Sequence, residues 1–329
     1  MPPRDDELAS WTRNGLCRVP AASAGERLDA FLARSFPYRS RTQWAALIKT
    51  GRIRLNEHLA RPARGLQAGD LLVYVPGRRP EPAVSRAYRV ILEDPWLLAI
   101  RKPANLPVHP SGRYFRHTLL LMLAADRGED LDTTDLRIVH RLDRETSGLI
   151  LFAKGRPAAA ALSIQFENRE VRKEYLAIVH GRPERDRFLV SAPIGPDPDS
   201  PVRKAVTVRP DGRIARTSFR VLRRGPEHAL IAARPHTGRL HQIRVHLRHA
   251  GHPIVGDKVY GKDAGIFVRF VSDRLTDDDR EKLLWRRQAL HAWKLAFRHP
   301  HDGHEVRLRA PVGKNWVRIV ERLGIVDRA

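Results

Sequence analysis

The 329-residue chain has little sulfur: one cysteine, Cys17, and two methionines. A single cysteine can form no internal disulfide and cannot build a thiolate metal site by itself. The chain also lacks a run of eighteen apolar residues, so the sequence predicts no membrane-spanning helix. The first residues, MPPRDDELASW, carry acids where a signal peptide would carry a basic and then an apolar stretch, and we therefore expect a cytoplasmic protein.

Motifs of several catalytic classes are missing as well. The chain has no G-x-S-x-G nucleophile motif and no H-E-x-x-H zinc motif. GDKVYGK, residues 256–262, has part of the spacing of a phosphate-binding loop, but Asp263 stands where a Ser or Thr would bind magnesium. A histidine-rich stretch has no carboxylate among its members, so we expect no metal and no cofactor, with a metal-dependent hydrolase as a disfavoured alternative. These histidines are His236, His241, His246, His249 and His252.

Positive charge is what the chain has in excess. Lys and Arg number 60 against 37 Asp and Glu, a net charge of +23. Such an imbalance favours a polyanionic partner, because basic surfaces release counterions when they meet phosphates. A membrane surface would call for a long basic amphipathic helix, and the sequence predicts none. Arginine-rich composition also fits a bias in base composition, so charge alone leaves the partner open.

The first part of the chain predicts a small basic domain. Residues 1–24 have weak patterning and are expected to be a tail, and residues 76–86, rich in Pro and Arg, a linker. Between them, residues 25–75 predict two helices and two strands, with Ser40 capping the second helix and Gly51 ending it. Residues 1–80 contain 14 Lys and Arg against 7 Asp and Glu, which suits phosphate contacts.

Residues 87–329 predict an α+β domain with a mixed, largely antiparallel sheet. Strands and helices alternate without a regular βαβ rhythm, and hairpins are frequent. The segments LRIVH and GLILFAK predict strands, PAAAALSIQFENRE and LHQIRVHLRHAG predict helices, and Asp302-Gly303 predicts a hairpin turn. Residues 263–280 look like a loop or an insertion, and the sequence leaves their structure open.

The segment HRLDRETSG, residues 140–148, places one carboxylate, Asp143, between Arg141 and Arg144. Apolar strands on both sides put Asp143 in a loop at strand ends, where reactive groups are displayed. Neighbouring guanidinium groups favour the ionised carboxylate, which can act as a nucleophile or as a base. Spacing alone leaves this role and a structural salt bridge equally open.

Several long motifs resemble those of the RluA-type family of RNA pseudouridine synthases. HRLDRETSGLILFAK is similar to the signature of that family, and four further blocks follow in its order. These blocks are IRKPANLPVHP, RKEYLAIVHG, RPHTGRLHQIRVHLRHAGHPIVGDKVYG and LHAWKLAFRHP. SRTQWAALIKTGRIRLNEH, followed by GLQAGDLLVYV, resembles an S4-like RNA-binding module. The resemblance implies a pseudouridine synthase fold and an enzyme that isomerises uridines in structured RNA without a cofactor.

The resemblance also implies roles for individual residues. Asp143 would be the catalytic nucleophile, Arg244 its ion-pair partner, and Tyr175 an aromatic platform for the uracil. Arg141 would take the place of a uridine flipped out of the RNA. The other residues of the matching motifs are expected to contact substrate or to shape its pocket: Leu142, Thr146, Ser147, Gly148, Lys173, His241 and Gln242.

The resemblance favours 23S rRNA as the target. VHPSGRYFRHTLL, residues 108–120, also resembles tRNA-directed members, so a tRNA substrate stays an alternative. A non-catalytic RNA-binding or ribosome assembly factor is a further one. We expect the protein to act on RNA as a monomer, away from membranes.

Overall fold

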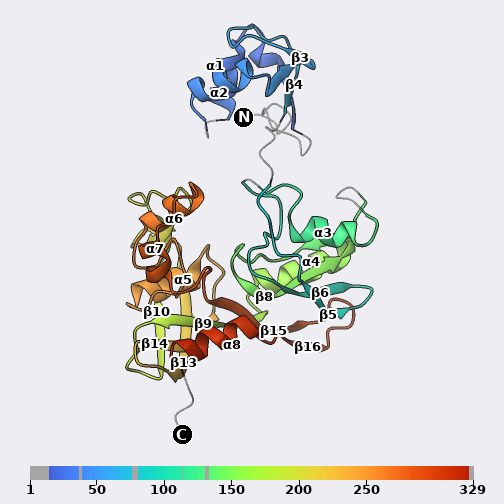
Figure 1. The fold of residues 1–329 in the computed structure, drawn as a ribbon. Coiled ribbons are helices and arrows are strands. Elements are labelled where there is room, and N and C mark those ends of the chain that lie inside the picture. The colour runs from blue at the N-terminus through green and yellow to red at the C-terminus, as the bar shows by residue number, and fades with distance from the viewer. Residues whose placement is uncertain (1–14, 37–38, 76–80, 113, 130–132, 326–329) are drawn as a thin grey trace. The chain divides into compact units, whose positions relative to one another are not determined.

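The chain divides into two compact units, Met1–Pro80 and Glu81–Ala329 (Figure 1). The computed structural model describes residues 15–36, 39–75, 81–112, 114–129 and 133–325. Each unit has an apolar core of its own, so each can be understood from its own packing.

The first unit combines two helices with a four-stranded antiparallel sheet. Its elements in sheet order are β1 (Leu16–Arg18), β4 (Leu71–Tyr74), β2 (Ile53–Leu55) and β3 (His58–Leu59), with α1 (Leu28–Ser35) and α2 (Arg41–Lys49). The start of α2 is fixed as the sequence predicts. The Ser40 hydroxyl accepts the Gln43 N–H at 3.2 Å, and the Gln43 side chain accepts the Ser40 N–H at 2.9 Å. The two helices and the sheet share one core, in which Trp44 is buried.

The prediction that residues 1–24 form a loose tail is wrong for residues 15–24, the part that the structure describes. Leu16–Arg18 form β1, which pairs with β4, and a 3₁₀ turn follows at Ala21–Ser23. Cys17 and Val19 are buried in the core of the unit. A three-residue strand is too short to show alternation in a sequence, which explains the miss. Residues 1–14 lie outside the described residues.

The linker expected over residues 76–86 is also shorter than predicted. Glu81 is anchored to the second unit, because its carboxylate accepts the backbone N–H groups of Phe115, Arg116 and His117 at 3.0, 2.7 and 2.7 Å. Burial alone would raise the pKa of Glu81, but these N–H groups lower it overall. The second unit thus begins at Glu81 and not at residue 87; residues 76–80 are not described.

The second unit is built on one large mixed sheet, as the α+β prediction requires. Its main path runs in the order β10, β13, β14, β9, β15, β8, β6, β5, with β16 on β15, β7 on β8, and β11 and β12 pairing separately. The strands are β5 (Arg89–Glu93), β6 (Leu97–Lys102), β7 (Leu136–Ile138), β8 (Ser147–Lys154), β9 (Arg172–His180), β10 (Arg187–Ser191), β11 (Ile194–Pro196), β12 (Val206–Val208), β13 (Arg216–Arg224), β14 (His228–Pro235), β15 (Leu290–Arg298) and β16 (Glu305–Arg309). Among the described strands of this unit, every pairing is antiparallel except that of β15 with β8.

The parallel pairing of β15 with β8 lies directly after the HRLDRETSG segment. Gly148 pairs with Ala292 at φ +109°. A Cβ on Gly148 would lie 2.1 Å from the carbonyl oxygen of Ala292, so only glycine permits this close approach. The start of β8, and with it the loop carrying Asp143, is therefore held at the middle of the sheet.

Six helices complete the described part of the second unit. They are α3 (Leu119–Ala125), α4 (Gly155–Glu167), α5 (Gln242–His249), α6 (Gly265–Val271), α7 (Asp277–Leu283) and α8 (Lys314–Arg322). Residues 263–280, whose structure the sequence left open as a loop or an insertion, contain α6 and most of α7. Arg269 joins the two helices by ion pairs with Asp263 and Asp279, both at 2.6 Å. None of the helices described is long and apolar enough to cross a membrane.

Two apolar cores divide the large sheet. One contains β6 and β8 with α3 and α4, and the other contains β9 and β14 with α5 and α8, which Figure 1 shows on separate halves of the unit. Tyr175, on β9, packs against both cores. The seam between the two halves is where the polar residues described next come together.

Candidate active site

A cavity of about 990 Å³ opens along this seam. One wall comes from residues 138–146 and the loop at 107–111, and the other from residues 234–244. Segments about a hundred residues apart in the chain thus line one space, with Asp143 among the lining residues.

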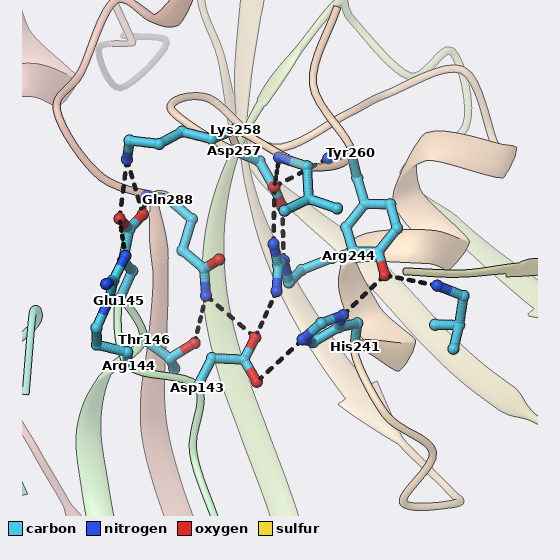
Figure 2. Close-up of polar contacts among 12 residues, drawn as sticks. Asp143, Arg144, Glu145, Thr146, His241, Arg244, Asp257, Lys258, Tyr260 and Gln288 are labelled. Atoms are coloured by element: carbon cyan, nitrogen blue, oxygen red, sulfur yellow. Dashed lines mark hydrogen bonds and ion pairs between the residues drawn. The ribbon is translucent and has the colours of Figure 1, made fainter. Parts of the chain in front are cut away.

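The Asp143 carboxylate has different surroundings at its two oxygens (Figure 2). Oδ2 accepts a hydrogen bond from Arg244 Nη1 at 2.8 Å and a longer one from Gln288 Nε2 at 3.4 Å. Oδ1 lies 3.8 Å from His241 Nε2. The side chain is 28% exposed, so Asp143 is held on one side and open on the other.

Arg244 is itself fixed by a second carboxylate. It comes from α5, its side chain is only 6% exposed, and its Nε and Nη2 donate to Asp257 at 2.7 and 2.8 Å. Asp257 also accepts the backbone N–H groups of Val259 and Tyr260, both at 3.0 Å. The Tyr260 ring lies 4.8 Å from the guanidinium. These contacts leave Nη1 aimed at Asp143 without freedom to turn.

This arrangement keeps Asp143 ionised. Burial is the largest single influence and would raise the pKa of Asp143, but Arg244, His241 and the hydrogen bond from Gln288 together lower the pKa below the usual value. The same pairing works in reverse on Arg244: burial opposes its charge, and Asp257 with Asp143 raises its pKa. A charged, oriented carboxylate at the edge of a cavity can act as a nucleophile or base.

The hydrogen bonds around His241 define its tautomer. Tyr260 Oη accepts the Val206 N–H at 3.0 Å and lies 2.7 Å from His241 Nδ1. Burial raises the pKa of Tyr260 to about 12, so its hydroxyl keeps a proton to donate to Nδ1. Burial also lowers the pKa of His241 to about 4, so the ring is neutral and carries its proton on Nε2, facing Asp143.

A second set of contacts holds the Asp143 loop from the side opposite Arg244. Lys258 donates to both oxygens of Glu145, at 2.9 and 3.0 Å, and to the carbonyl of Arg286 at 2.7 Å. The Gln288 side chain donates to Thr146 Oγ1 at 2.6 Å, and its backbone N–H donates to Glu145 at 3.2 Å. Glu145 and Thr146 thus tie the loop to the segments before β15.

Arg144, the other arginine beside Asp143, does not pair with that carboxylate. It donates to the Tyr114 hydroxyl at 2.9 Å and forms an ion pair with Glu145 at 3.3 Å. Its guanidinium also lies 5.5 Å from the rings of Tyr114 and of Phe270 on α6. Arg144 therefore connects the Asp143 loop to two neighbouring segments.

Arg141 is exposed and lines the cavity. Its Nη1 lies 3.5 Å from His109 Nε2. The other ring nitrogen of His109 is buried and has no hydrogen-bond partner among the described residues. The Arg141 guanidinium is therefore available to a ligand in the cavity.

Tyr175 and Lys173 form a further part of the lining, together with the buried Leu142. Burial raises the pKa of the Tyr175 phenol, and burial lowers the pKa of Lys173. The Lys173 ammonium lies 5.6 Å from the ring of Phe166, which also lines the cavity. This wall offers an aromatic face and a cation in a mostly apolar setting.

Three residues of the predicted site have structural contacts. The Gln242 amide accepts from Thr237 and Arg239 and donates to Thr217 and the carbonyl of Arg216, so its hydrogen-bonding capacity is used inside the protein. Ser147 turns away from the cavity and lies 2.9 Å from His291 Nδ1. Gly148 supplies the close strand contact described above.

The histidine-rich stretch does not gather around one point. His236 lies at the Ser218 hydroxyl, His246 between the Thr217 hydroxyl and the carbonyl of Ala192, and His252 at the carbonyl of His180. Only His241 of this stretch reaches Asp143.

Five residues of the network were not predicted from the sequence: Glu145, Asp257, Lys258, Tyr260 and Gln288. Asp257, Lys258 and Tyr260 lie in GDKVYGK, which was considered as a phosphate-binding loop and as the end of a family block, without a role for these residues. A buried carboxylate needs a partner of opposite charge. The position of Asp257 between apolar segments was therefore the available signal that it pairs with an arginine elsewhere in the chain. Gln288 carries no such signal.

Comparison with known families agrees with this geometry. A family model described as RNA pseudouridylate synthase matches residues 97–249, and the S4 domain model matches residues 26–72.

Relatives match along most of the chain. A protein of Neisseria meningitidis named ribosomal large subunit pseudouridine synthase D is 37% identical over 316 residues, covering 94% of this chain and 82% of the relative. A Vibrio vulnificus protein named ribosomal large subunit pseudouridine synthase C is 32% identical and covers 91% and 93%.

Solved structures show the same fold. Human RNA pseudouridylate synthase domain containing 1 superposes with a TM-score of 0.56 at 25% identity, over 70% of this chain and 86% of that one. Human RNA pseudouridylate synthase domain containing 4 gives 0.53 at 27% identity, over 71% and 92%. The family resemblance seen in the motifs is confirmed: the chain belongs to the RNA pseudouridylate synthase family and carries an S4 domain ahead of its synthase domain.

Proposed function

We propose that this enzyme converts specific uridines of large-subunit ribosomal RNA, 23S rRNA, to pseudouridine. The names of its relatives support this target, since several are large ribosomal subunit synthases matched over more than 90% of the chain. The observation that carries the catalytic proposal is the Asp143 carboxylate, which Arg244 holds at one oxygen while the other borders the cavity.

Pseudouridine formation is an isomerisation. The bond from ribose C1′ to uracil N1 breaks and a bond from C1′ to C5 forms, while C5 loses a proton and N1 gains one. Asp143 acts as the nucleophile through Oδ1, the oxygen that Arg244 leaves free. His241 Nε2 lies 3.8 Å from that oxygen, beyond hydrogen-bond distance, and its N–H dipole favours the ionised carboxylate.

The uridine must leave the base stack to reach Asp143, because a stacked nucleotide hides its glycosidic bond. Tyr175 then supports the flipped uracil; base–aromatic stacking contributes about 1–3 kcal/mol per base. Arg141, exposed at the cavity, fills the gap left in the RNA by stacking and hydrogen bonding.

Cations around the cavity suit an RNA backbone. Five of its lining residues are Arg169, Arg172, Lys204, Arg234 and Arg239. Such groups hold phosphates in register without reading sequence, so they support binding and leave the choice of uridine to RNA shape.

The test is Asp143→Asn, which keeps the shape of the side chain and removes its charge. Single-turnover pseudouridine formation in large-subunit rRNA from a strain lacking this gene should fall by more than about 10³-fold. RNA affinity should stay within about twofold, because Asp143 is an acid and contributes nothing to phosphate binding. Asp302→Asn, an exposed carboxylate in the β15–β16 turn, is the matched control and should keep full activity.

Parallel reactions with tRNA from the same strain separate the two RNA classes. Modification of tRNA with rRNA left unchanged would replace the proposed target and keep the chemistry. Wild-type protein that modifies neither RNA would favour the assembly-factor alternative.

A further inference from the structure

A second cavity, of about 370 Å³, lies on the other side of the Asp143 loop. Ser147, the residue after Thr146, lines this space, whereas Asp143 and Thr146 line the first one. Three basic side chains border it: Arg101 and Lys102 at the end of β6, and Arg287 before β15. No carboxylate is among its described lining residues.

Lys102 is the innermost of these cations. Its side chain is 1% exposed, and its ammonium donates to the carbonyls of Pro103, Leu106 and Arg144 at 2.9, 2.8 and 3.1 Å. Burial lowers the pKa of Lys102 to about 7; Asp143 raises it, and the nearby charge of Arg287 lowers it further. Carbonyl dipoles satisfy its hydrogen bonds, but they do not neutralise its charge.

Neither arginine forms an ion pair with a carboxylate in the described part of the chain. The Arg287 guanidinium lies 4.5 Å from the Trp285 ring. Burial lowers the pKa of Arg287, and the more distant charge of Glu145 opposes this shift without cancelling it. Arg101 has one weak contact, 3.4 Å to the carbonyl of Pro311.

Elsewhere in the same unit, buried guanidinium charge is neutralised. Arg244, on the other side of the loop, has two carboxylates at 2.7 and 2.8 Å. The contrast matters because a desolvated charge is costly unless an opposite charge accompanies it. Two guanidinium groups without ion pairs and the partly charged Lys102 face one space that has no carboxylate among its described lining residues, which indicates that a ligand supplies negative charge there.

We propose that this second cavity is a binding site for a phosphate group, held by Arg101 and Arg287. Guanidinium forks match the oxygens of phosphate and bind it with two parallel hydrogen bonds. Asn105 and Asn315 also line the space and can donate amide hydrogens. The site does not depend on the reaction proposed above.

A phosphate bound there would stabilise the back of the Asp143 loop. Lys102 holds the carbonyl of Arg144, and His291 holds Ser147, so both walls of the second cavity are parts of that loop or touch it. Neutralising the cations removes repulsion at the base of the loop. The phosphate can belong to the RNA backbone or be free in solution.

The proposal is tested by thermal unfolding of the full-length protein in sodium phosphate and in sodium chloride of equal ionic strength. Arg101→Gln and Arg287→Gln are compared with Arg298→Gln, which removes the same charge from an exposed arginine with one carbonyl contact at 3.3 Å. The melting temperatures of the wild type and of Arg298→Gln should be higher in phosphate than in chloride. Both cavity variants should lose most of this shift, with at least a tenfold weaker apparent Kd for phosphate.

Two further measurements keep the result interpretable. Arg287→Lys, which retains the charge, should recover part of the phosphate response, and melting temperatures in chloride alone report whether each variant is folded.

The salt dependence of RNA binding identifies the source of the phosphate. If an RNA phosphate occupies the cavity, the slope of log K against log salt should be lower by about one in Arg287→Gln than in the wild type. A free phosphate would leave the slope unchanged. Phosphate responses and slopes equal to those of Arg298→Gln in both cavity variants would overturn the proposal.

Discussion

Asp143 gives one carboxylate oxygen to the protein and presents the other to the cavity. Arg244 binds Oδ2. The Arg244 guanidinium cannot turn toward a substrate, because Asp257 accepts hydrogen bonds from two of its nitrogens. A carboxylate that kept both oxygens in ion pairs would be a poor nucleophile, and one without a partner would be protonated more easily when buried. The division between the two oxygens resolves this conflict.

His241 faces the free oxygen, and its tautomer depends on Tyr260. Tyr260→Phe removes the hydroxyl that donates to Nδ1 but keeps the ring beside Arg244. We expect the neutral His241 ring to become a mixture of both tautomers. The pKa of His241, about 4 in the wild type because of burial, should rise because the donor that favours the neutral ring is lost. Nitrogen-15 NMR of labelled protein measures both the tautomer populations and the pKa of His241.

The same variant should affect turnover more than binding. With the Nε2 proton no longer fixed toward Asp143, kcat should fall by about tenfold while KM for RNA changes little, because the cationic rim is untouched. Below the pH at which His241 becomes charged, the difference from wild type should shrink, since both nitrogens then carry protons. An unchanged tautomer in Tyr260→Phe would contradict the assignment.

For single residues, the family resemblance in the sequence predicted that Arg244 pairs with Asp143, but not the geometry of the pair. Asp143 and Arg244 are 101 residues apart in the sequence. Only the family resemblance predicted their ion pair, because a local sequence pattern does not report contacts between distant segments. Arg141 and Arg144 were the obvious ion-pair partners by spacing, yet the loop turns both away from Asp143. Backbone direction within a loop is set by contacts from other elements, which a short sequence window does not contain.

At the scale of elements, the pair of Glu145 and Lys258 joins the Asp143 loop to the segment that carries Asp257. Their side chains are 14% and 4% exposed, so this ion pair is largely removed from water. Lys258→Met should lower the free energy of unfolding by about 2 kcal/mol, because it leaves the partly buried Glu145 with only the longer ion pair to Arg144 at 3.3 Å.

A double-mutant cycle isolates this pair. Adding Glu145→Gln to Lys258→Met should cost less than the sum of the single changes, with a coupling of about 2 kcal/mol in urea unfolding. Lys282→Met, which breaks an exposed ion pair with Asp278 on α7, should stay close to wild type. Additive single changes would show that the pair does not hold the loop.

Long and strongly patterned elements were predictable. β8 and α4 agree with their sequence signals, since a continuous apolar run and an apolar helix face each report burial. β1, β11 and β12 have three residues each and were missed, as was α3. α6 and α7 were not predicted because ion pairs of Arg269 with Asp263 and Asp279, and not a long apolar stripe, hold them together.

At the scale of the whole molecule, positive charge is spread over both units. Residues 1–80 have 14 Lys and Arg against 7 Asp and Glu, and residues 81–329 contain the other 46 against 30. The S4 domain thus lies in a unit with a positive net charge of its own. Its expected task is to add phosphate contacts, which raise affinity for RNA without selecting a base.

Arg54 on β2 offers a direct test of that task. It is exposed, and no acid in the described residues pairs with it, whereas Arg34 in the same unit pairs with Glu26 at 2.7 Å. If Arg54 binds a phosphate, Arg54→Gln should lower the slope of log K against log salt by about one and weaken binding to every RNA similarly. Arg34→Gln removes the same charge from a neutralised pair and should leave the slope unchanged. The rate of the bound complex should be the same in both, because the proposed chemistry is carried by Asp143 and its neighbours in the second unit. Equal slopes in the two variants would mean that the S4 domain contacts RNA through another face or not at all.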